Sequence, residues 1–269
     1  MNCRSPVIAL TVAAALLVAC VHRPPEGANL QGLLPTPLLL LGEQHDAPEH
    51  QALQRDTLRQ LIRNGQAGAL VLEMAERGRS TRGLPRDTSE ARVREALDWR
   101  DDLNAGAWSW ATYGPLVMEA VRAGVPVLGG NLPRHQMRPA MAEATLDAAL
   151  DATALGLQRE AIREGHCNLL PASQIPPMTR IQIARDRAMA QTAQASLQPG
   201  RTVLLVAGHQ HVRRDIGIPQ HLPGQALAVV VAQAGHGSAE PAAADRVWHT
   251  PPLPPQDHCA ALKRQMGPT

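Results

Sequence analysis

The chain has 269 residues and a formal net charge of +2 at pH 7. This near-balance of charge does not predict a basic surface, so nucleic acid is not an expected partner. Aromatic residues are scarce, with no Phe and a single Tyr, Tyr113, so the core must consist mainly of aliphatic side chains.

The N-terminus has the order of features found in export signals. A short positive region that ends at Arg4 is followed by the apolar run 6–19. This run is shorter than the roughly 20 residues that a membrane span needs, and it suits a signal peptide, residues 1–19. The small residue before Cys20 resembles a bacterial lipobox, in which Cys20 carries lipid and anchors the protein to a membrane. The alternative is an ordinary signal peptide with an incidental cysteine.

The residue after Cys20 bears on the membrane to which the anchor attaches. Val21 stands there instead of the Asp that resembles an inner-membrane retention signal. We therefore expect an outer-membrane lipoprotein that faces the periplasm. Two cysteines, Cys167 and Cys259, remain in the mature chain. An oxidising compartment and an even count favour a disulfide between them, and two free thiols are the alternative.

The mature chain divides into three parts by composition. Residues 20–37 are rich in Pro and Gly and are expected to be a tether. Residues 38–237 form the predicted domain. Residues 238–269 hold six prolines and are expected to be an irregular tail.

Short apolar runs alternate with longer helical patterns through the domain. The expected strands are 38–41, 69–72, 125–128, 202–207 and 226–231. The expected helices are 49–64, 88–103, 107–123 and several within 136–198. Continuously apolar strands separated by helices predict an α/β fold, a single domain with a mostly parallel central sheet and helices on both faces.

Polar side chains follow every expected strand. They are Glu43 and His45, then Glu73, then Asn131, Arg134 and His135, then His209 and His211, and finally His236. Carboxyl ends of parallel strands meet at one edge of a sheet, so a crevice is expected there. The matched Gly-x-x-His motifs at 42–45 and 208–211 are expected to turn the chain sharply into it. The cluster suits a divalent metal or acid–base chemistry, but a buried polar network explains it equally well.

Two helical patterns offer further candidates. Trp110 and Tyr113 share one helix face, as core residues or as ligand contacts, and a Tyr phenolate can bind haem iron. Gln182, Asp186 and Met189 also share a face, which indicates a buried network or, less readily, a pocket wall.

Six stretches between Leu38 and Leu222 carry a family resemblance. They are LLLLGEQHDAPEHQ, LVLEMAERG, WSWATYGPLV, VPVLGGNLPR, HCNLLPASQIPPMTRIQIARDRAMAQ and LLVAGHQHVRRDIGIPQHL. In this order they resemble the ChaN-like haem-binding uptake lipoproteins of the Tiki superfamily.

The resemblance implies an α/β lipoprotein involved in haem-iron acquisition. Family members bind haem through a Tyr, with two haems face to face in a dimer, so the resemblance implies Tyr113 as the ligand and a homodimer. Trp110 is expected beside the haem and Arg134 at its propionates. The chain departs from the family at His209, where a small residue or Asn is usual; the extra imidazole either adds a ligand or crowds the site.

The wider superfamily implies a different function for the crevice. It includes metal-dependent peptidases and an antibiotic esterase branch, which use residues near Glu43, His45, Glu73 and His211. The alternative function is therefore a metal-dependent hydrolase, with Glu43, His45, His209 and His211 as candidate metal ligands and Glu43 or Glu73 as base. A third reading is a binding protein for another periplasmic ligand.

Overall fold

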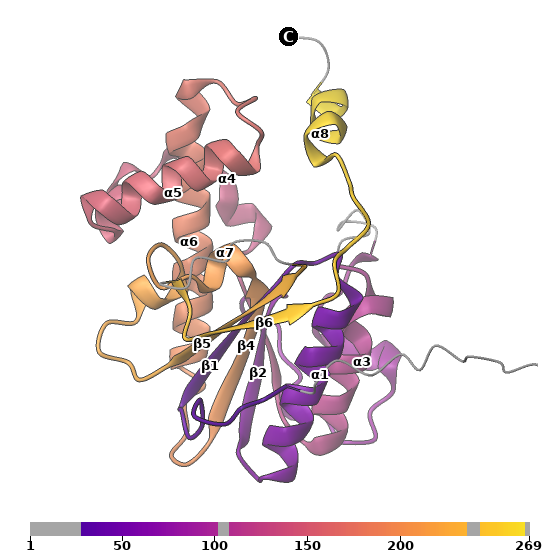
Figure 1. Ribbon diagram of the computed structural model, residues 1–269. Coiled ribbons are helices and arrows are strands. Elements are labelled where there is room, and N and C mark those ends of the chain that lie inside the picture. Colours follow the sequence, from indigo (N-terminus) through magenta and orange to yellow (C-terminus); the bar gives the residue numbers. More distant parts are fainter. Residues whose placement is uncertain (1–27, 102–107, 236–242, 267–269) are drawn as a thin grey trace, which may run out of the picture.

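The computed structural model describes residues 28–101, 108–235 and 243–266. Within these residues six strands form one sheet in the order β3-β2-β4-β1-β5-β6, and all pairings are parallel (Figure 1). The strands are β1 Leu38–Glu43, β2 Ala67–Glu76, β3 Val127–Asn131, β4 Thr202–Gly208, β5 Ala228–Ala234 and β6 Arg246–Thr250. The predicted fold class is confirmed.

Helices cover both faces of the sheet. They are α1 Pro48–Arg63, α2 Glu90–Ala96, α3 Trp110–Ala123, α4 Arg134–Ala142, α5 Ala152–Gly165, α6 Ile175–Gln194, α7 His209–Val212 and α8 His258–Met266. Short 3-10 turns lie at Ala144–Ala149, Ala172–Gln174 and Ile218–His221. Figure 1 shows α1 and α3 side by side on one face and α6 on the other, with α4 and α5 beyond it.

The alternation of side chains along β1 explains this arrangement. Leu39 and Leu41 belong to the core under α1 and α3, whereas Leu38 and Leu40 belong to the core under α6. All four leucines are at most 1% exposed. A strand buried on both faces needs apolar residues at successive positions, which is the pattern that identified it.

The ends of α3 follow from its sequence. The Ser109 side chain accepts a hydrogen bond from the backbone N–H of Thr112, 3.3 Å away, which caps the helix start. The helix ends at Gly124, whose φ of 77° lies in the left-handed region that Gly adopts without strain. These two signals fix the segment that carries Tyr113.

The prediction of an irregular tail at 238–269 is wrong for its described part. Residues 246–250 form β6, which pairs with β5, and residues 258–266 form α8. β6 is an edge strand with partly exposed side chains, so it lacks the continuous apolar run of the inner strands. Four of the six prolines that suggested irregularity lie between the two elements.

The prediction of a free tether also fails for residues 28–37. Leu30 and Leu33 are buried in the core on the α1 side. The Arg246 guanidinium donates to the backbone oxygens of Asn29 and Gln31, at 2.6 and 2.8 Å. This segment is therefore part of the domain. The expected signal peptide, 1–19, and Cys20 lie outside the described residues.

Two further observations concern the membrane and the cysteines. Among the described residues, no helix has both the length and the apolarity to cross a membrane.

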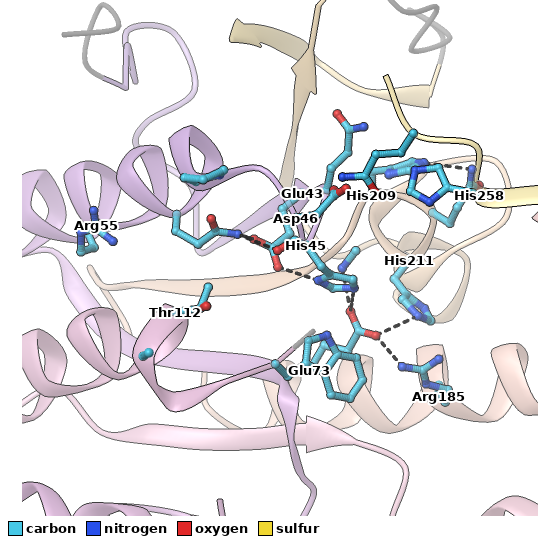
Figure 2. Close-up of a pocket in the computed structure, with 18 residues that line it drawn as sticks. Glu43, His45, Asp46, Arg55, Glu73, Thr112, Arg185, His209, His211 and His258 are labelled. Carbon is cyan, nitrogen blue, oxygen red and sulfur yellow. Dashed lines mark hydrogen bonds and ion pairs between the residues drawn. The ribbon is translucent and has the colours of Figure 1, made fainter. Parts of the chain in front are cut away.

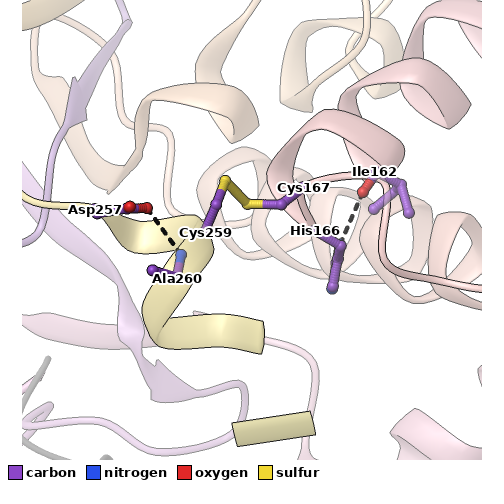
Figure 3. The surroundings of a disulfide bond; sticks show 6 residues. All are labelled: Ile162, His166, Cys167, Asp257, Cys259 and Ala260. Carbon is purple, nitrogen blue, oxygen red and sulfur yellow. Dashed lines mark hydrogen bonds between the residues drawn. A yellow bond between two sulfur atoms is a disulfide. The ribbon is translucent and has the colours of Figure 1, made fainter. Parts of the chain in front are cut away.

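Cys167, just after α5, lies against Cys259 in α8, with the two sulfur atoms 2.00 Å apart (Figure 3). This contact ties the C-terminal helix to the end of α5.

A candidate binding cavity at the carboxyl edge of the sheet

A cavity of about 1050 Å³ opens at the carboxyl ends of three adjacent strands. Glu43 of β1, Glu73 of β2 and Gly208 of β4 contribute to its lining (Figure 2). Helices α1, α3 and α7 and the C-terminal segment before α8 form the remaining walls. The four residues that the sequence predicted to share a crevice, Glu43, His45, Glu73 and His211, all line it.

Glu73 is the centre of a buried ion network. It accepts hydrogen bonds from the Arg185 guanidinium and, at 2.6 Å, from the backbone N–H of Gly208, while His211 Nε2 lies 3.3 Å from it. Burial alone would raise the pKa of Glu73, but the positive charges of His211 and Arg185 outweigh burial and hold its pKa well below the usual range. Glu73 is therefore an ionised carboxylate.

His211 is held between two carboxylates. Its Nδ1 lies 2.6 Å from Asp186 Oδ1, and its Nε2 faces Glu73. Burial opposes the charged form, yet the charges of Glu73 and Asp186 raise the pKa of His211 to about 9. Both ring nitrogens of His211 therefore carry hydrogens at neutral pH, and each faces a carboxylate. The buried network favoured for the helix face of Asp186 is present.

Glu43 and His45 form a second contact pair. His45 Nδ1 lies 2.7 Å from Glu43 Oε1, and the amides of Gln51 and Gln54 donate to Glu43 Oε2. Burial lowers the pKa of His45, whereas the hydrogen bond to Glu43 and the charge of Glu73 raise it. The two upward effects together exceed the effect of burial, so the pKa of His45 is raised overall. The His45 side chain is 30% exposed, so it can meet a ligand in the cavity.

Tyr113, the haem ligand that the resemblance implies, is buried below the cavity in this structure. Its side chain is 0% exposed, and its hydroxyl donates to Glu43 beneath the cavity floor. Burial and the charge of Glu43 raise the pKa of Tyr113, which opposes the phenolate that iron would require. The helix pattern placed Tyr113 on the inner face, but it could not distinguish core from cavity.

The other two predicted haem contacts also lie elsewhere. Trp110 is 6% exposed, and its indole N–H donates to Glu90. Arg134 lies beside Glu76, with Nε and Oε1 3.8 Å apart, and lines a separate small cavity. The aromatic side chain in the main cavity is Trp108, which makes an edge contact with His45 at a centroid distance of 5.6 Å.

His209 is the neutral imidazole of the cavity. Burial lowers its pKa, and its ring makes a hydrogen bond with the backbone of Glu43. His209 Nε2 lies 3.2 Å from the amide nitrogen of Gln210. Gln210 is exposed, and its side chain can move aside for a ligand.

The candidate metal ligands are engaged in contacts within the protein. Among residues 28–101, 108–235 and 243–266, no group of three or more His, Cys, Asp or Glu side chains is arranged to hold an ion. Glu43 and Glu73 accept hydrogen bonds from neighbouring donors, and His211 lies between two carboxylates. Glu43, His45, His209 and His211 all line the cavity, and their role as metal ligands stays a prediction.

The two Gly-x-x-His glycines allow close packing rather than sharp turns. A methyl group on Gly42, which lies within β1, would stand 2.4 Å from Val212 Cγ2 and 3.0 Å from the His209 Cα. A methyl group on Gly208 would stand 3.1 Å from His45 Nε2. The first glycine lets α7 approach the sheet, and the second leaves room beneath His45.

Several lining residues were missed by the sequence analysis. Gln51 and Arg55 are four apart in α1 and both line the cavity, together with Arg185 of α6. Gln256 and His258 enter from the segment that was expected to be irregular. Charged residues on an amphipathic helix usually indicate solvent, so only the order of the sheet reveals that Arg55 faces a cavity. Of the other predicted polar residues, Asn131 donates to the Glu73 backbone oxygen at 2.9 Å, and His135 is exposed outside the cavity. His236 lies outside the described residues.

A parallel α/β sheet with a polar cavity across the carboxyl ends of adjacent strands defines the class of open α/β ligand-binding domains and enzymes. Residues 30–222 match the family described as haem-binding uptake, Tiki superfamily, ChaN. The match spans well over half of the chain, which therefore belongs to this family, and the resemblance seen in the sequence is confirmed.

Comparison with solved structures agrees with this assignment of the fold. The chain is similar to ChaN of Campylobacter jejuni, a structure described by its cofacial haem binding, with 23% identity, coverage of 81% of this chain and 89% of that chain, and a TM-score of 0.66. It is also similar to a mutant of the erythromycin esterase EreC in its open conformation, with 14% identity, coverage of 76% and 71%, and a TM-score of 0.45. Comparison with curated proteins gives no significant match.

Proposed function

We propose that this protein binds haem in the cavity at the carboxyl edge of the sheet. The observation that carries the proposal is a cavity of about 1050 Å³ lined by the imidazoles of His45, His209 and His258 and the indole of Trp108. Sites for cofactors commonly measure roughly 300–1,000 Å³ and combine an apolar wall with a few polar groups. Membership of a haem-binding family supports the same ligand.

The donor set of the cavity fits an imidazole ligand to haem iron. When bound, haem would supply an iron centre with an axial position that takes a protein ligand, and His is a common one. Of the four histidines that line the cavity, His209 offers a neutral ring whose Nε2 contacts the exposed amide of Gln210. A second contact of the ring to a backbone group is the usual way to orient such a ligand. The residue that departs from the family pattern is thus the one best suited to bind iron here.

The other cavity residues would position the porphyrin. Trp108 offers an apolar surface beside His45, and the partly exposed ring of His45 offers a nitrogen for a hydrogen bond. Its partner Glu43 is fixed by two glutamine amides, so His45 keeps its orientation with or without ligand.

Hemin titration of the domain tests this proposal. We expect a Soret band to appear on binding, and His209→Ala to shift the band and weaken affinity by at least about tenfold, about 1.4 kcal/mol. His135→Ala is the matched control, because it removes a histidine outside the cavity and should leave the spectrum unchanged. Absence of hemin binding by the wild-type domain would refute the proposal. An unchanged spectrum in His209→Ala would reject His209 as ligand and move the test to His45 and His258.

We further propose that the protein is anchored by lipid at Cys20 to the outer membrane, faces the periplasm and serves haem-iron acquisition as a homodimer. The support is the signal-like N-terminus and Val21 after the cysteine, together with the family. Cys20→Ser should abolish incorporation of labelled acyl chains and release the protein from membranes. Deletion of the gene should impair growth with hemin as the iron source, and hemin should shift the purified domain to a dimer in light scattering. Acylation of Cys20→Ser would reject the lipid anchor, unimpaired growth would reject the role in iron acquisition, and a domain that stays monomeric with hemin would reject the homodimer.

A hydrolase is the second candidate, and the Glu43–His45 contact favours it. A His whose Nδ1 is paired with a carboxylate can act as a general base through Nε2. Hydrolysis of a chromogenic ester that is lost in His45→Asn, and unaffected by chelators, would support this function. Absence of turnover above the rate of His45→Asn would exclude it for that substrate.

A further inference from the structure

Arg55 lies at the end of the cavity remote from the ion network. It comes one helical turn after Gln51 on the cavity face of α1, and Thr112 of α3 lines the same end. Figure 2 shows Arg55 and Thr112 on the α1 and α3 side, while Glu73, Arg185 and His211 lie on the opposite side. The two sides of the cavity therefore differ in their chemistry.

The cations of the cavity differ in their partners. Arg185 is bound to Glu73 and to Asn131, at 2.9 Å for the second contact. One turn after Arg55, outside the cavity, Arg59 pairs with Glu119. Arg55 makes no ion pair within the described part of the chain, although it is only partly exposed and faces the cavity. A guanidinium in this setting is available to an anion from outside the chain.

We propose that Arg55 binds a carboxylate of the cavity ligand. A guanidinium matches a carboxylate with two parallel hydrogen bonds, and such charge-assisted pairs are stronger than neutral ones. Because the proposal rests on haem as the ligand, the carboxylate is a propionate. The porphyrin then lies along the cavity, with its propionate edge between α1 and α3 and its iron toward His209. This assignment replaces Arg134, which lies outside the cavity.

The test compares a porphyrin with its ester. Hemin and hemin dimethyl ester differ in the charge of the propionates, so each is titrated into the wild-type domain and into Arg55→Gln in the same buffer and detergent. We expect the substitution to weaken hemin binding by about tenfold and to leave ester binding unchanged. Arg55→Lys should recover part of the hemin affinity, since it restores the charge without the planar fork. Arg63→Gln removes the same charge from the exposed end of α1 and serves as the matched control.

The outcomes separate this inference from the proposed function. Hemin binding that is equally strong in wild type and Arg55→Gln, or a loss that is equal for hemin and its ester, overturns the role of Arg55 and leaves haem binding intact. If no variant binds hemin, both proposals fail for haem. Metal-free protoporphyrin IX, followed by fluorescence, adds a readout that does not depend on iron ligation. The ratio of acid to ester affinity must again fall in Arg55→Gln, and an unchanged ratio counts against the inference.

Discussion

The Tyr113 hydroxyl and the His45 Nδ1 meet at the same oxygen of Glu43. Tyr113 donates to Glu43 Oε1 from below, while His45 lies 2.7 Å from this atom on the cavity side. The single tyrosine of the chain therefore supports the carboxylate that orients His45. Tyr113 is therefore a positioning residue, whereas His45 lies where a ligand can contact it.

Tyr113→Phe should change stability rather than ligand spectra. Loss of the hydroxyl removes one donor to a buried carboxylate, which costs about 1.5–3 kcal/mol for a hydrogen bond to a charged group. Urea unfolding should show this loss, and the hemin spectrum should keep the wild-type band positions. Disappearance of a charge-transfer band in the variant would instead make Tyr113 an iron ligand and would contradict the structure.

Glu73→Gln should destabilise the domain strongly. The carboxylate compensates the Arg185 guanidinium and the His211 imidazolium in a buried setting, where removal of one charge typically costs about 3–5 kcal/mol. The pKa of His211 should also fall, because one of the two charges that raise it is gone. Chemical denaturation and NMR titration of the imidazole measure the two effects. Glu76→Gln, at the exposed end of the same strand, is the control, and equal stability of the two variants would reject the network as a stabilising feature.

The apo domain should lose stability as pH falls from 6.5 toward 4. His50 is fully buried, with Nδ1 2.9 Å from the Gln44 backbone nitrogen and Nε2 3.0 Å from Thr250 Oγ1. Burial lowers its pKa to about 4, so in this window the unfolded chain binds a proton that the folded chain does not. His221 has a pKa lowered to about 4 in the same way.

The measurement is urea unfolding across this pH range. The free energy of unfolding should fall by about 2 kcal/mol between pH 6.5 and 4 through His50. His50→Gln should give a shallower decline, because Gln can offer a donor and an acceptor but does not titrate. Parallel pH profiles of the two proteins would show that His50 does not contribute.

The Cys167–Cys259 bond should form in protein exported to an oxidising compartment. Peptide mapping without reductant should recover the linked peptides, and two free thiols would refute the pairing. The cysteines are 92 residues apart, and closure of a loop of this size stabilises a domain by about 2–4 kcal/mol. Replacement of both cysteines by Ser should lower the melting temperature, while reductant should leave that variant unchanged.

The sequence predicted the fold and the polar cluster because both depend on strands. Continuous apolar runs such as Leu38–Leu41 identify buried parallel strands, and the residue after each run must lie at the same edge. Glu43, Glu73 and His211 met there for this reason. The edge strand β6 was missed because it has no continuous apolar run. Its sequence, RVWHT, mixes polar and apolar residues, and most of its side chains are partly or fully exposed.

The role of each side chain was harder to predict than the edge of the sheet at which it lies. Tyr113 and Trp108 lie five residues apart near the start of α3, and their difference in exposure depends on how the helix packs against α1 and the sheet. Arg55 looks like a solvent-facing charge until the helix is seen beside the cavity. Spacing gives a direction for each side chain, whereas packing depth comes from tertiary contacts.

The entry point of the chain sets the orientation of the cavity. Arg246 at the start of β6 and Gln60 near the end of α1 hold residues 28–31 at the amino edge of the sheet, opposite to the edge that carries the cavity. The described chain thus enters the domain at the edge of the sheet opposite to the mouth of the cavity. A ligand or a partner protein that reaches the cavity therefore approaches from the side remote from this point of entry.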